Sequence, residues 1–169
     1  MIELVLGGAR SGKSGYAAQR AEATRLPVVY LATAQALDEE MRERIAHHRA
    51  ERPDAWRTVE EPLALAAALA REAAPGRCLL VDCLTLWLSN LLLAGREEEI
   101  EALIAALPAL PGALILVSNE VGWGIVPENA LARRFRDEQG RLNQRIAQLA
   151  DRVTLIAAGL PLVLKGAPR

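Results

Sequence analysis

The stretch Gly7-Gly8-Ala9-Arg10-Ser11-Gly12-Lys13-Ser14 decides how the rest of this sequence is interpreted. It matches the pattern G-x-x-x-x-G-K-[ST] and lies between an apolar, strand-like segment, Ile2–Leu6, and a segment compatible with a helix, Lys13–Arg25. Gly7 and Gly12 let the backbone turn so that successive N–H groups converge on phosphate oxygens at a helix N-terminus. The stretch therefore predicts a phosphate-binding loop (P-loop) that takes a nucleoside triphosphate.

Two side chains of the loop have expected roles. Lys13 can reach the β- and γ-phosphates, and the Ser14 hydroxyl can coordinate Mg²⁺. The sequence has only two lysines, Lys13 and Lys165, and uses arginine for its other cations, so a lysine at this position is not background. The alternative is a glycine-rich turn that binds no ligand.

The composition is typical of one globular domain, residues 1–169. The net charge of −1 favours neither nucleic acid nor an anionic membrane as a partner. The most apolar stretch, Cys78–Ala94, contains Asp82 and Asn90, which argues against a membrane span. Met1 leads directly into a strand without a basic segment, so we expect no signal peptide.

The two cysteines, Cys78 and Cys83, are expected to be reduced. Five positions apart along a strand, they would point to opposite faces and could not form a disulfide. Reduced thiols are typical of the cytoplasm, which is the predicted location.

Short leucine-rich or β-branched runs alternate with longer segments of helical period. Near-continuous apolar strands between helices predict an α/β fold with a mostly parallel sheet, covered by helices on both faces. The expected strands are Ile2–Leu6, Val28–Ala32, Cys78–Val81, Leu114–Ser118, Val153–Ala157 and Pro161–Leu164. The expected helices are Lys13–Arg25, Asp38–Ala50, Pro62–Ala74, Leu84–Leu93, Arg96–Leu107 and Pro127–Ala150.

Ligands of such sheets bind at the C-terminal ends of the strands, so the residues that follow each strand are candidates. Asp82 ends an apolar run, in the form of a carboxylate that holds Mg²⁺ directly or through water. The alternative is a carboxylate that caps the next helix. Glu120 could contact metal, orient a substrate or begin a loop.

The only histidines, His47 and His48, are adjacent near the end of an expected helix. Because neighbours on a helix point about 100° apart, they cannot share one role. His48 continues a stripe with Met41 and Ile45 that faces the protein body, whereas His47 points away. From spacing alone, a pair that interacts favourably with the helix C-terminus is the simpler interpretation.

The expected helix Pro127–Ala150 is rich in arginine. Its buried stripe is Leu131, Phe135, Leu142, Ile146 and Leu149. Arginines on another face are predicted to be solvated and interlaced with acidic residues of the same helix. These arginines are Arg134, Arg141 and Arg145, and the acidic residues are Asp137 and Glu138. The alternative is that one or two arginines engage phosphate or a partner subunit.

Several further segments accompany the P-loop. They are Tyr30-Leu31-Ala32-Thr33-Ala34, Arg44-Ile45-Ala46-His47-His48-Arg49, Arg52-Pro53 through Glu60, Asp82-Cys83-Leu84-Thr85, Asn119 through Asn129, and Arg136-Asp137 through Gln144. Together they resemble the bifunctional adenosylcobinamide kinase / adenosylcobinamide-phosphate guanylyltransferase family along nearly the whole chain. The stretch from Asn119 to Asn129 is highly specific.

The resemblance implies a RecA-like P-loop core, a homotrimer and two reactions that use Mg²⁺. ATP or GTP first phosphorylates adenosylcobinamide. GTP then gives GMP to an enzyme histidine and releases pyrophosphate, and the cobinamide phosphate takes the GMP to form adenosylcobinamide-GDP.

Residue by residue, the resemblance implies nucleotide contacts from Gly7, Gly8, Ala9, Arg10, Ser11, Gly12, Lys13, Ser14, Ala32, Thr33, Ala34, Arg49, Ala50, Glu51, Arg52, Glu60 and Asp82. The implied catalytic residues are Lys13 and His48, and the implied Mg²⁺ ligands are Ser14 and Asp82. His48 would be the guanylylated residue, a role that suits a neutral imidazole. Some relatives carry Glu at the position of Asp82, which leaves open whether this shorter side chain serves metal, guanine or both.

Two other functions share these features. One is a P-loop kinase of another small alcohol, with purely structural histidines. The other is a RecA-like nucleotide-dependent regulator that signals through assembly.

Overall fold

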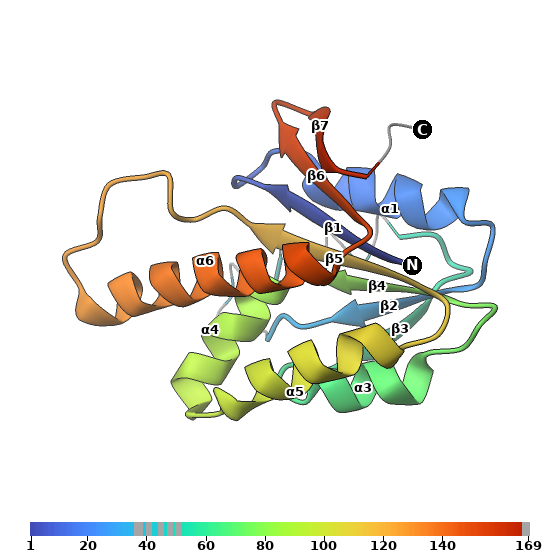
Figure 1. The fold of residues 1–169 in the computed structure, drawn as a ribbon, viewed down its shortest axis with the longest axis horizontal. Coiled ribbons are helices and arrows are strands. Elements are labelled where there is room, and N and C mark those ends of the chain that lie inside the picture. Colours follow the sequence, from blue (N-terminus) through green and yellow to red (C-terminus); the bar gives the residue numbers. More distant parts are fainter. Residues whose placement is uncertain (36–38, 40–41, 44–45, 47–48, 50–51, 167–169) are drawn as a thin grey trace.

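The computed structural model describes residues 1–35, 39, 42–43, 46, 49 and 52–166. Within this part, seven strands form one sheet in the order β3-β2-β4-β5-β1-β6-β7 (Figure 1). The strands are β1 Ile2–Gly7, β2 Val28–Ala32, β3 Arg57–Glu60, β4 Cys78–Asp82, β5 Ala113–Asn119, β6 Arg152–Ala157 and β7 Leu160–Lys165. Every neighbouring pair is parallel except β6 and β7. The predicted mostly parallel sheet is confirmed.

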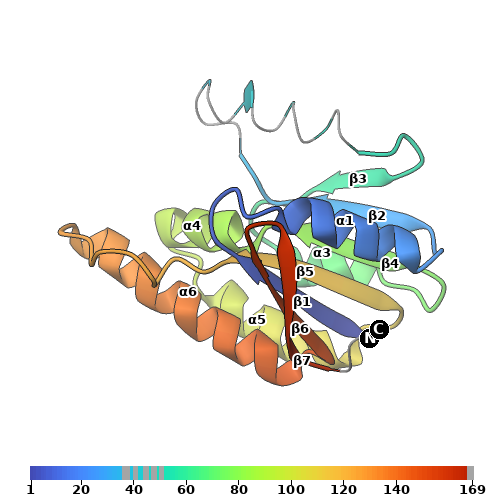
Figure 2. The same cartoon turned by 90° about the horizontal axis from the view of Figure 1, so that it is seen from above.

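Helices cover both faces of this sheet (Figure 2). They are α1 Lys13–Ala23, α3 Leu65–Glu72, α4 Leu84–Ala94, α5 Glu98–Ala106 and α6 Ala130–Leu149, with a 3₁₀ turn, η1, at Leu107–Ala109. On one face α1 packs against a smaller apolar cluster that includes Val5 and Ile115. On the other face, α3 to α6 surround a larger cluster that contains the fully buried Trp87.

The structure differs from the predicted elements at β3, α3 and α6. Helix α3 begins at Leu65 and ends at Glu72, inside the predicted range Pro62–Ala74. Strand β3 was not expected, because it is a short edge strand of polar sequence, Arg57-Thr58-Val59-Glu60, without an apolar run. Helix α6 begins at Ala130 instead of Pro127, since the Asn129 side chain accepts a hydrogen bond from the Ala132 N–H and caps the helix there.

The predicted helix Asp38–Ala50 falls mainly outside the described residues. Those of its members that are described are helical and exposed: Glu39, Arg42, Glu43, Ala46 and Arg49. Both histidines, Met41 and Ile45 lie outside the described residues, so the inward-facing stripe stays a prediction.

Both cysteines are free, as predicted. They are also buried, and they do not lie on opposite faces as expected. Strand β4 ends at Asp82, so the alternation of side chains does not extend to Cys83, and both thiols join the cluster under α1. Burial raises the pKa of each thiol to about 11. Among the described residues, no helix is both long and apolar enough to cross a membrane.

Candidate nucleotide-binding site

The P-loop joins β1 to α1 in a shape that requires its glycines. Gly12 is the N-cap of α1 with a φ of 93°, in the left-handed region that favours glycine. A Cβ on Gly7 would lie 2.8 Å from the Ile156 carbonyl oxygen and against the Ser11 side chain. The Lys13 ammonium donates to the Gly8 carbonyl oxygen at 3.0 Å, which keeps this cation over the loop.

The turn between β6 and β7 braces the P-loop from the side. The Gly159 N–H donates to the Ser11 carbonyl oxygen at 2.9 Å, from a turn in which Ala158 and Gly159 both have positive φ. The Ser11 hydroxyl is buried and has no hydrogen-bond partner among the described residues. A buried, unpaired polar atom inside a loop of converging N–H groups fits a phosphate oxygen as its partner.

Three of the predicted nucleotide contacts lie in one row at the C-terminal edge of the sheet. Ala32 of β2 pairs with Glu60 of β3 on one side and with Asp82 of β4 on the other. On the far side of β5, Gly7 pairs with Asn119. The structure therefore brings the strand-end candidates and the P-loop to the same edge, as the parallel sheet predicts.

Asp82 is held by a neighbouring strand. The Tyr30 hydroxyl donates to Asp82 Oδ2 at 3.0 Å. Burial, with the nearby Asp82 carboxylate, raises the pKa of Tyr30 far above its usual value, so the hydroxyl stays protonated and acts as a donor. The N-cap residue of α4 is Cys83, which removes the alternative that Asp82 merely caps this helix.

The Thr33 side chain has a structural role that was not predicted. Its hydroxyl donates to the Cys83 carbonyl oxygen at 2.7 Å and accepts from the Cys83 N–H at 3.0 Å, which joins the ends of β2 and β4. The Asn90 amide of α4 donates to the Thr33 carbonyl oxygen at 2.8 Å. Thr33 is 0% exposed, and both its hydroxyl and its carbonyl oxygen are engaged in these internal hydrogen bonds.

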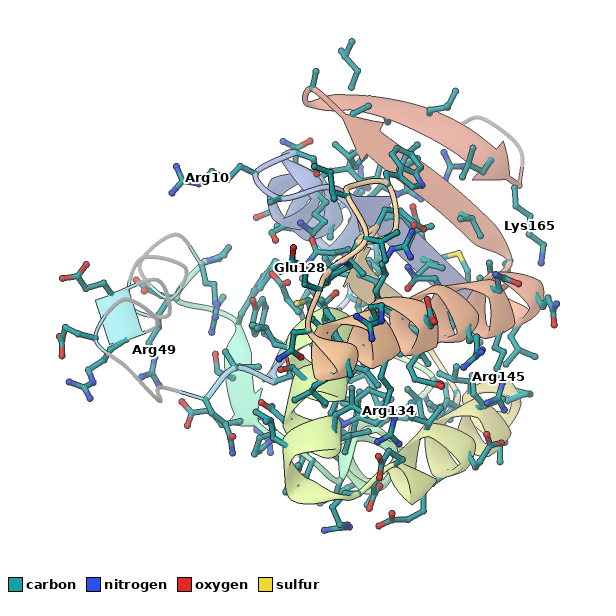
Figure 3. The ribbon with its side chains drawn as sticks, turned by 90° about the vertical axis from the view of Figure 1, so that its left-hand side faces the viewer. Arg10, Arg49, Glu128, Arg134, Arg145 and Lys165 are labelled. Atoms are coloured by element: carbon teal, nitrogen blue, oxygen red, sulfur yellow. The ribbon has the colours of Figure 1, made fainter. Side chains whose placement is uncertain are left out.

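Two of the predicted arginines are placed at the same edge. The Arg52 guanidinium lies over the Tyr30 ring, 3.6 Å from its centroid, and Trp56 stacks on the same tyrosine. Arg49 lies 3.8 Å from Glu60 in an exposed ion pair. Figure 3 shows Arg10 and Arg49 on the same side of the molecule, with Arg10 extending outward. The remaining predicted residues, His48, Ala50 and Glu51, lie outside the described residues.

A buried polar network at the end of β5 was not predicted. Asn143 of α6 accepts from the Ser118 hydroxyl at 2.7 Å and donates to the Asn119 carbonyl oxygen at 3.0 Å and to Glu120 Oε1 at 3.3 Å. Gln139 of α6 donates to both Ser118 and Asn143. The Glu120 N–H donates to the Gly7 carbonyl oxygen at 3.1 Å, so this network ends beside the P-loop.

Two of the five arginines of α6 form ion pairs with residues of the α5 segment. Arg134 pairs with Glu97 and Arg145 with Glu101, both on the α5 side (Figure 3), whereas Arg141 pairs with Glu138 of α6. The arginine face of α6, which was predicted to be solvated, therefore partly contacts the α5 segment. The buried apolar stripe of α6 is also shorter than predicted, because Leu131 is exposed at the start of the helix.

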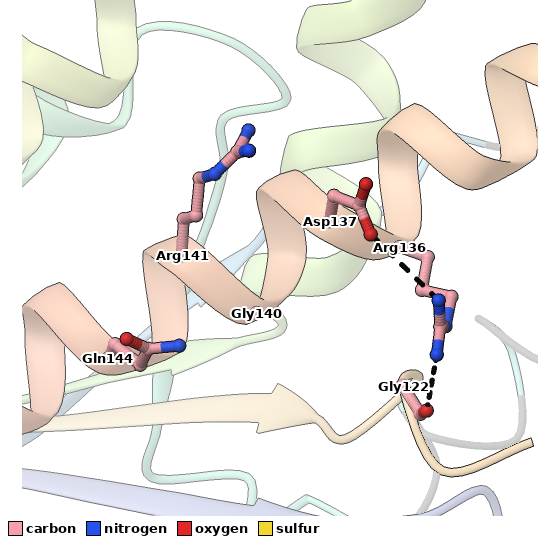
Figure 4. A pocket seen from close by; sticks show the side chains of 6 residues that line it. All are labelled: Gly122, Arg136, Asp137, Gly140, Arg141 and Gln144. Atoms are coloured by element: carbon pink, nitrogen blue, oxygen red, sulfur yellow. Dashed lines mark hydrogen bonds and ion pairs between the residues drawn. The ribbon is translucent and has the colours of Figure 1, made fainter.

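An open pocket of about 310 Å³ lies between α6 and the loop after β5 (Figure 4). Arg136 donates to the Gly122 carbonyl oxygen at 3.0 Å across it. Arg141 points away from Gly122 (Figure 4), so the two arginines do not converge on one anion.

Comparison with known proteins identifies the family. Residues 3–164 match the family described as cobinamide kinase / cobinamide phosphate guanyltransferase. This chain belongs to that family. The bifunctional adenosylcobalamin biosynthesis protein CobP of Pseudomonas aeruginosa is 59% identical over 172 residues, which span 99% of both chains. CobU of Salmonella typhimurium, with a similar name, is 44% identical over 98% of this chain and its own full length.

Solved structures support the fold alone. The flagellar accessory protein FlaH from Methanocaldococcus jannaschii aligns with a TM-score of 0.52 at 13% identity, covering 99% of this chain and 81% of its own. A protein from Pyrococcus horikoshii, project PH0250, aligns with a TM-score of 0.57 at 11% identity, covering 99% and 87%. These alignments agree with the predicted α/β fold with a mostly parallel sheet.

Membership in the cobinamide kinase / guanyltransferase family makes the P-loop edge the candidate site of an enzyme. The groups that the sequence did not reveal there are Tyr30, the Gly159 turn and Asn143. Tyr30 lies in one of the segments that resemble the family, and Asn143 follows Gln139 at helical spacing. Neither pattern predicts the residue that each contacts, which is Asp82 for Tyr30 and Ser118 for Asn143.

Proposed function

We propose that this chain catalyses both reactions of its family: phosphorylation of adenosylcobinamide by ATP or GTP, then transfer of GMP from GTP to the product. The observation that carries the proposal is the match over residues 3–164, in a chain whose P-loop and Asp82 meet at one edge of the sheet. A triphosphate bound along that edge can react at its γ-phosphorus or at its α-phosphorus.

In the kinase step, a hydroxyl oxygen of the corrinoid side chain attacks the γ-phosphorus. The bond to the β–γ bridging oxygen breaks, the nucleoside diphosphate leaves and the hydroxyl proton is released. The P-loop N–H groups and Lys13 would stabilise the charge on the transferring phosphoryl group.

In the transferase step, an imidazole nitrogen of His48 attacks the α-phosphorus and pyrophosphate leaves. A phosphate oxygen of the phosphorylated corrinoid then attacks the same phosphorus, the P–N bond breaks and adenosylcobinamide-GDP forms. A covalent intermediate divides one nucleotidyl transfer into two easier steps. The role of His48 rests on the family resemblance.

The Ser14 hydroxyl and the Asp82 carboxylate are hard oxygen donors, the kind that Mg²⁺ prefers beside phosphates. Mg²⁺ held there would neutralise negative charge on the triphosphate. We also propose that the chain forms a homotrimer in the cytoplasm. Light scattering should then give about three times the chain mass of 18.3 kDa.

A labelling experiment tests the covalent step. GTP labelled at its α-phosphate should leave acid-labile, alkali-stable label on the protein, and the intact mass should rise by one GMP. His48→Ala should abolish the label and keep kinase activity, because the γ-phosphoryl transfer does not use this imidazole. His47→Ala is the matched control and should keep the label.

The other outcomes separate the alternatives. Label that persists in His48→Ala but disappears in His47→Ala would move the role to His47. A protein that phosphorylates an alcohol but gains no GMP and releases no pyrophosphate would be a kinase only. Nucleotide-dependent assembly without any transfer to cobinamide would indicate a regulator.

A further inference from the structure

Tyr30 of β2 contacts two of the expected nucleotide-binding side chains, Asp82 and Arg52, and the proposed reactions give it no role of its own. It is 6% exposed and lies in the middle of β2, with its hydroxyl directed to the strand end at Asp82. We propose that Tyr30 is a positioning residue whose hydroxyl fixes the Asp82 carboxylate and whose ring fixes the Arg52 guanidinium. This inference rests on the proposed function, because it treats Asp82 and Arg52 as groups that act on the nucleotide.

The hydroxyl contact fixes one oxygen of Asp82. Tyr30 pairs with Leu80 in the sheet, so its hydroxyl reaches two positions along β4 to donate to Asp82 Oδ2 at 3.0 Å. A carboxylate held by one oxygen loses rotational freedom and presents the other oxygen in a set direction. A site group that is pre-organised in this way needs less reordering when the ligand binds.

The ring contact fixes Arg52. Its guanidinium carbon lies 3.6 Å from the ring centroid, well within the distance at which a cation is attracted to an aromatic face. The Arg52 Nε atom is buried without a hydrogen-bond partner among the described residues, and the bond from Arg52 Nη1 to Thr58 Oγ1 is long at 3.5 Å. The ring, flanked by Trp56, is therefore the main support of this cation.

Tyr30 contacts residues from two separate parts of the chain. Asp82 ends the inner strand β4, whereas Arg52 follows the segment that carries the histidines. The tyrosine thus sets the position of a carboxylate and of a cation relative to each other. Removing the hydroxyl should disturb only the first, and removing the ring should disturb both.

Nucleotide affinity, measured by calorimetry on the full chain, tests the hydroxyl. The probe is a GTP analogue with a methylene group between the α- and β-phosphorus atoms, which binds but cannot guanylylate the protein. Mg²⁺ should increase the affinity of the wild-type protein for the analogue. In Tyr30→Phe this increase should be roughly 10-fold smaller, which is the effect of losing a hydrogen bond to a charged group. Affinity without metal should stay within about 2-fold, because the ring remains under Arg52.

A double variant shows whether Tyr30 acts through Asp82. If it does, Tyr30→Phe combined with Asp82→Asn should bind the Mg²⁺ analogue no more weakly than Asp82→Asn alone. Tyr16→Phe is the control, since it removes the same atom from the chain's other tyrosine, on α1.

Tyr30→Leu tests the ring. It should lose a further factor of about 3 in affinity with and without metal, and this added loss should vanish in the background of Arg52→Met. Should Tyr30→Leu fail to fold, the Tyr30→Phe series still decides the hydroxyl half.

Two results would overturn the inference. The first is a Tyr30→Phe protein that is less heat-stable but has the wild-type ratio of affinities with and without Mg²⁺, as expected if the tyrosine only packs. The second is full additivity in both double variants. Wild-type protein that does not bind the analogue at all would instead refute the proposed function.

Discussion

The ends of β4 and β5 lie side by side, on the same side of the P-loop strand β1, and each holds a carboxylate with a neutral donor. We call these two strand ends the β4 flank and the β5 flank; they build the contact differently. On the β4 flank, Asp82 accepts a hydrogen bond from Tyr30, a side chain of the neighbouring strand. On the β5 flank, Glu120 accepts one from Asn143, an amide of the covering helix α6. Tyr30 is surrounded by groups expected to bind nucleotide, whereas Asn143 belongs to an internal network.

This difference predicts whether each flank contributes mainly to ligand binding or to folding stability. A residue that serves groups at the edge of a site should affect binding more than folding. A residue with several buried hydrogen bonds should affect folding first, since its removal leaves polar groups unpaired in a low-dielectric interior. We therefore expect the β4 flank to respond mainly in affinity and the β5 flank mainly in stability.

Lys13→Ala should have the largest effect, because the P-loop serves both reactions. Removing one donor of a preorganised electrostatic site typically costs on the order of 100- to 1,000-fold in kcat, and we expect losses of this size in both activities. Kinase turnover and GMP labelling, measured on the same preparation, check this. Normal kinase turnover in the variant would show that the P-loop is not shared.

Asn143→Ala should cost stability on the β5 flank. Asn143 is 4% exposed and bonds to Ser118, Asn119, Glu120 and Gln139, so the variant leaves several buried groups unpaired. The free energy of unfolding in urea should fall by about 3 kcal/mol.

The neighbouring amide supplies the control for that comparison. Gln144→Ala removes an exposed side chain from the same helix and should change the free energy of unfolding by less than about 0.5 kcal/mol. If the two variants were equally stable, the network would not support the fold. The contrast between the flanks would then fail.

What the sequence predicted was local. The P-loop, the apolar strands and the position of Asp82 follow from short patterns that a neighbouring strand or helix does not alter. Strand β3 was not predicted because an edge strand needs no apolar run. The start of α6 depends on which residue caps the helix, and in the structure this is Asn129.

What the sequence could not predict depends on distant partners. Tyr30 and Asp82 are 52 positions apart, and Arg145 and Glu101 are 44 apart, so no local period connects them. Asn143 and Gln139 have helical spacing, but asparagine and glutamine are mostly exposed in proteins, so this spacing alone does not predict that they are buried. Their burial follows from the docking of α6 beside β5.

The smallest effect should come from the loop that follows the β5 flank. This loop extends away from the sheet (Figures 1 and 2), and Ile125 is 97% exposed and Trp123 75% exposed. Because Ile125 buries almost no surface, Ile125→Ser should change the free energy of unfolding by less than about 0.5 kcal/mol.

The same variant shows whether these apolar side chains have another use. A corrinoid is a large amphipathic ligand, and exposed apolar groups next to a site are typical of a surface that contacts one. If the loop takes part, Ile125→Ser should raise the KM for adenosylcobinamide by about 3-fold, the cost of losing a small apolar contact, and leave the KM for GTP unchanged. An equal rise in both constants would place the loop with the nucleotide, and no change in either would leave the β5 flank with a structural role alone.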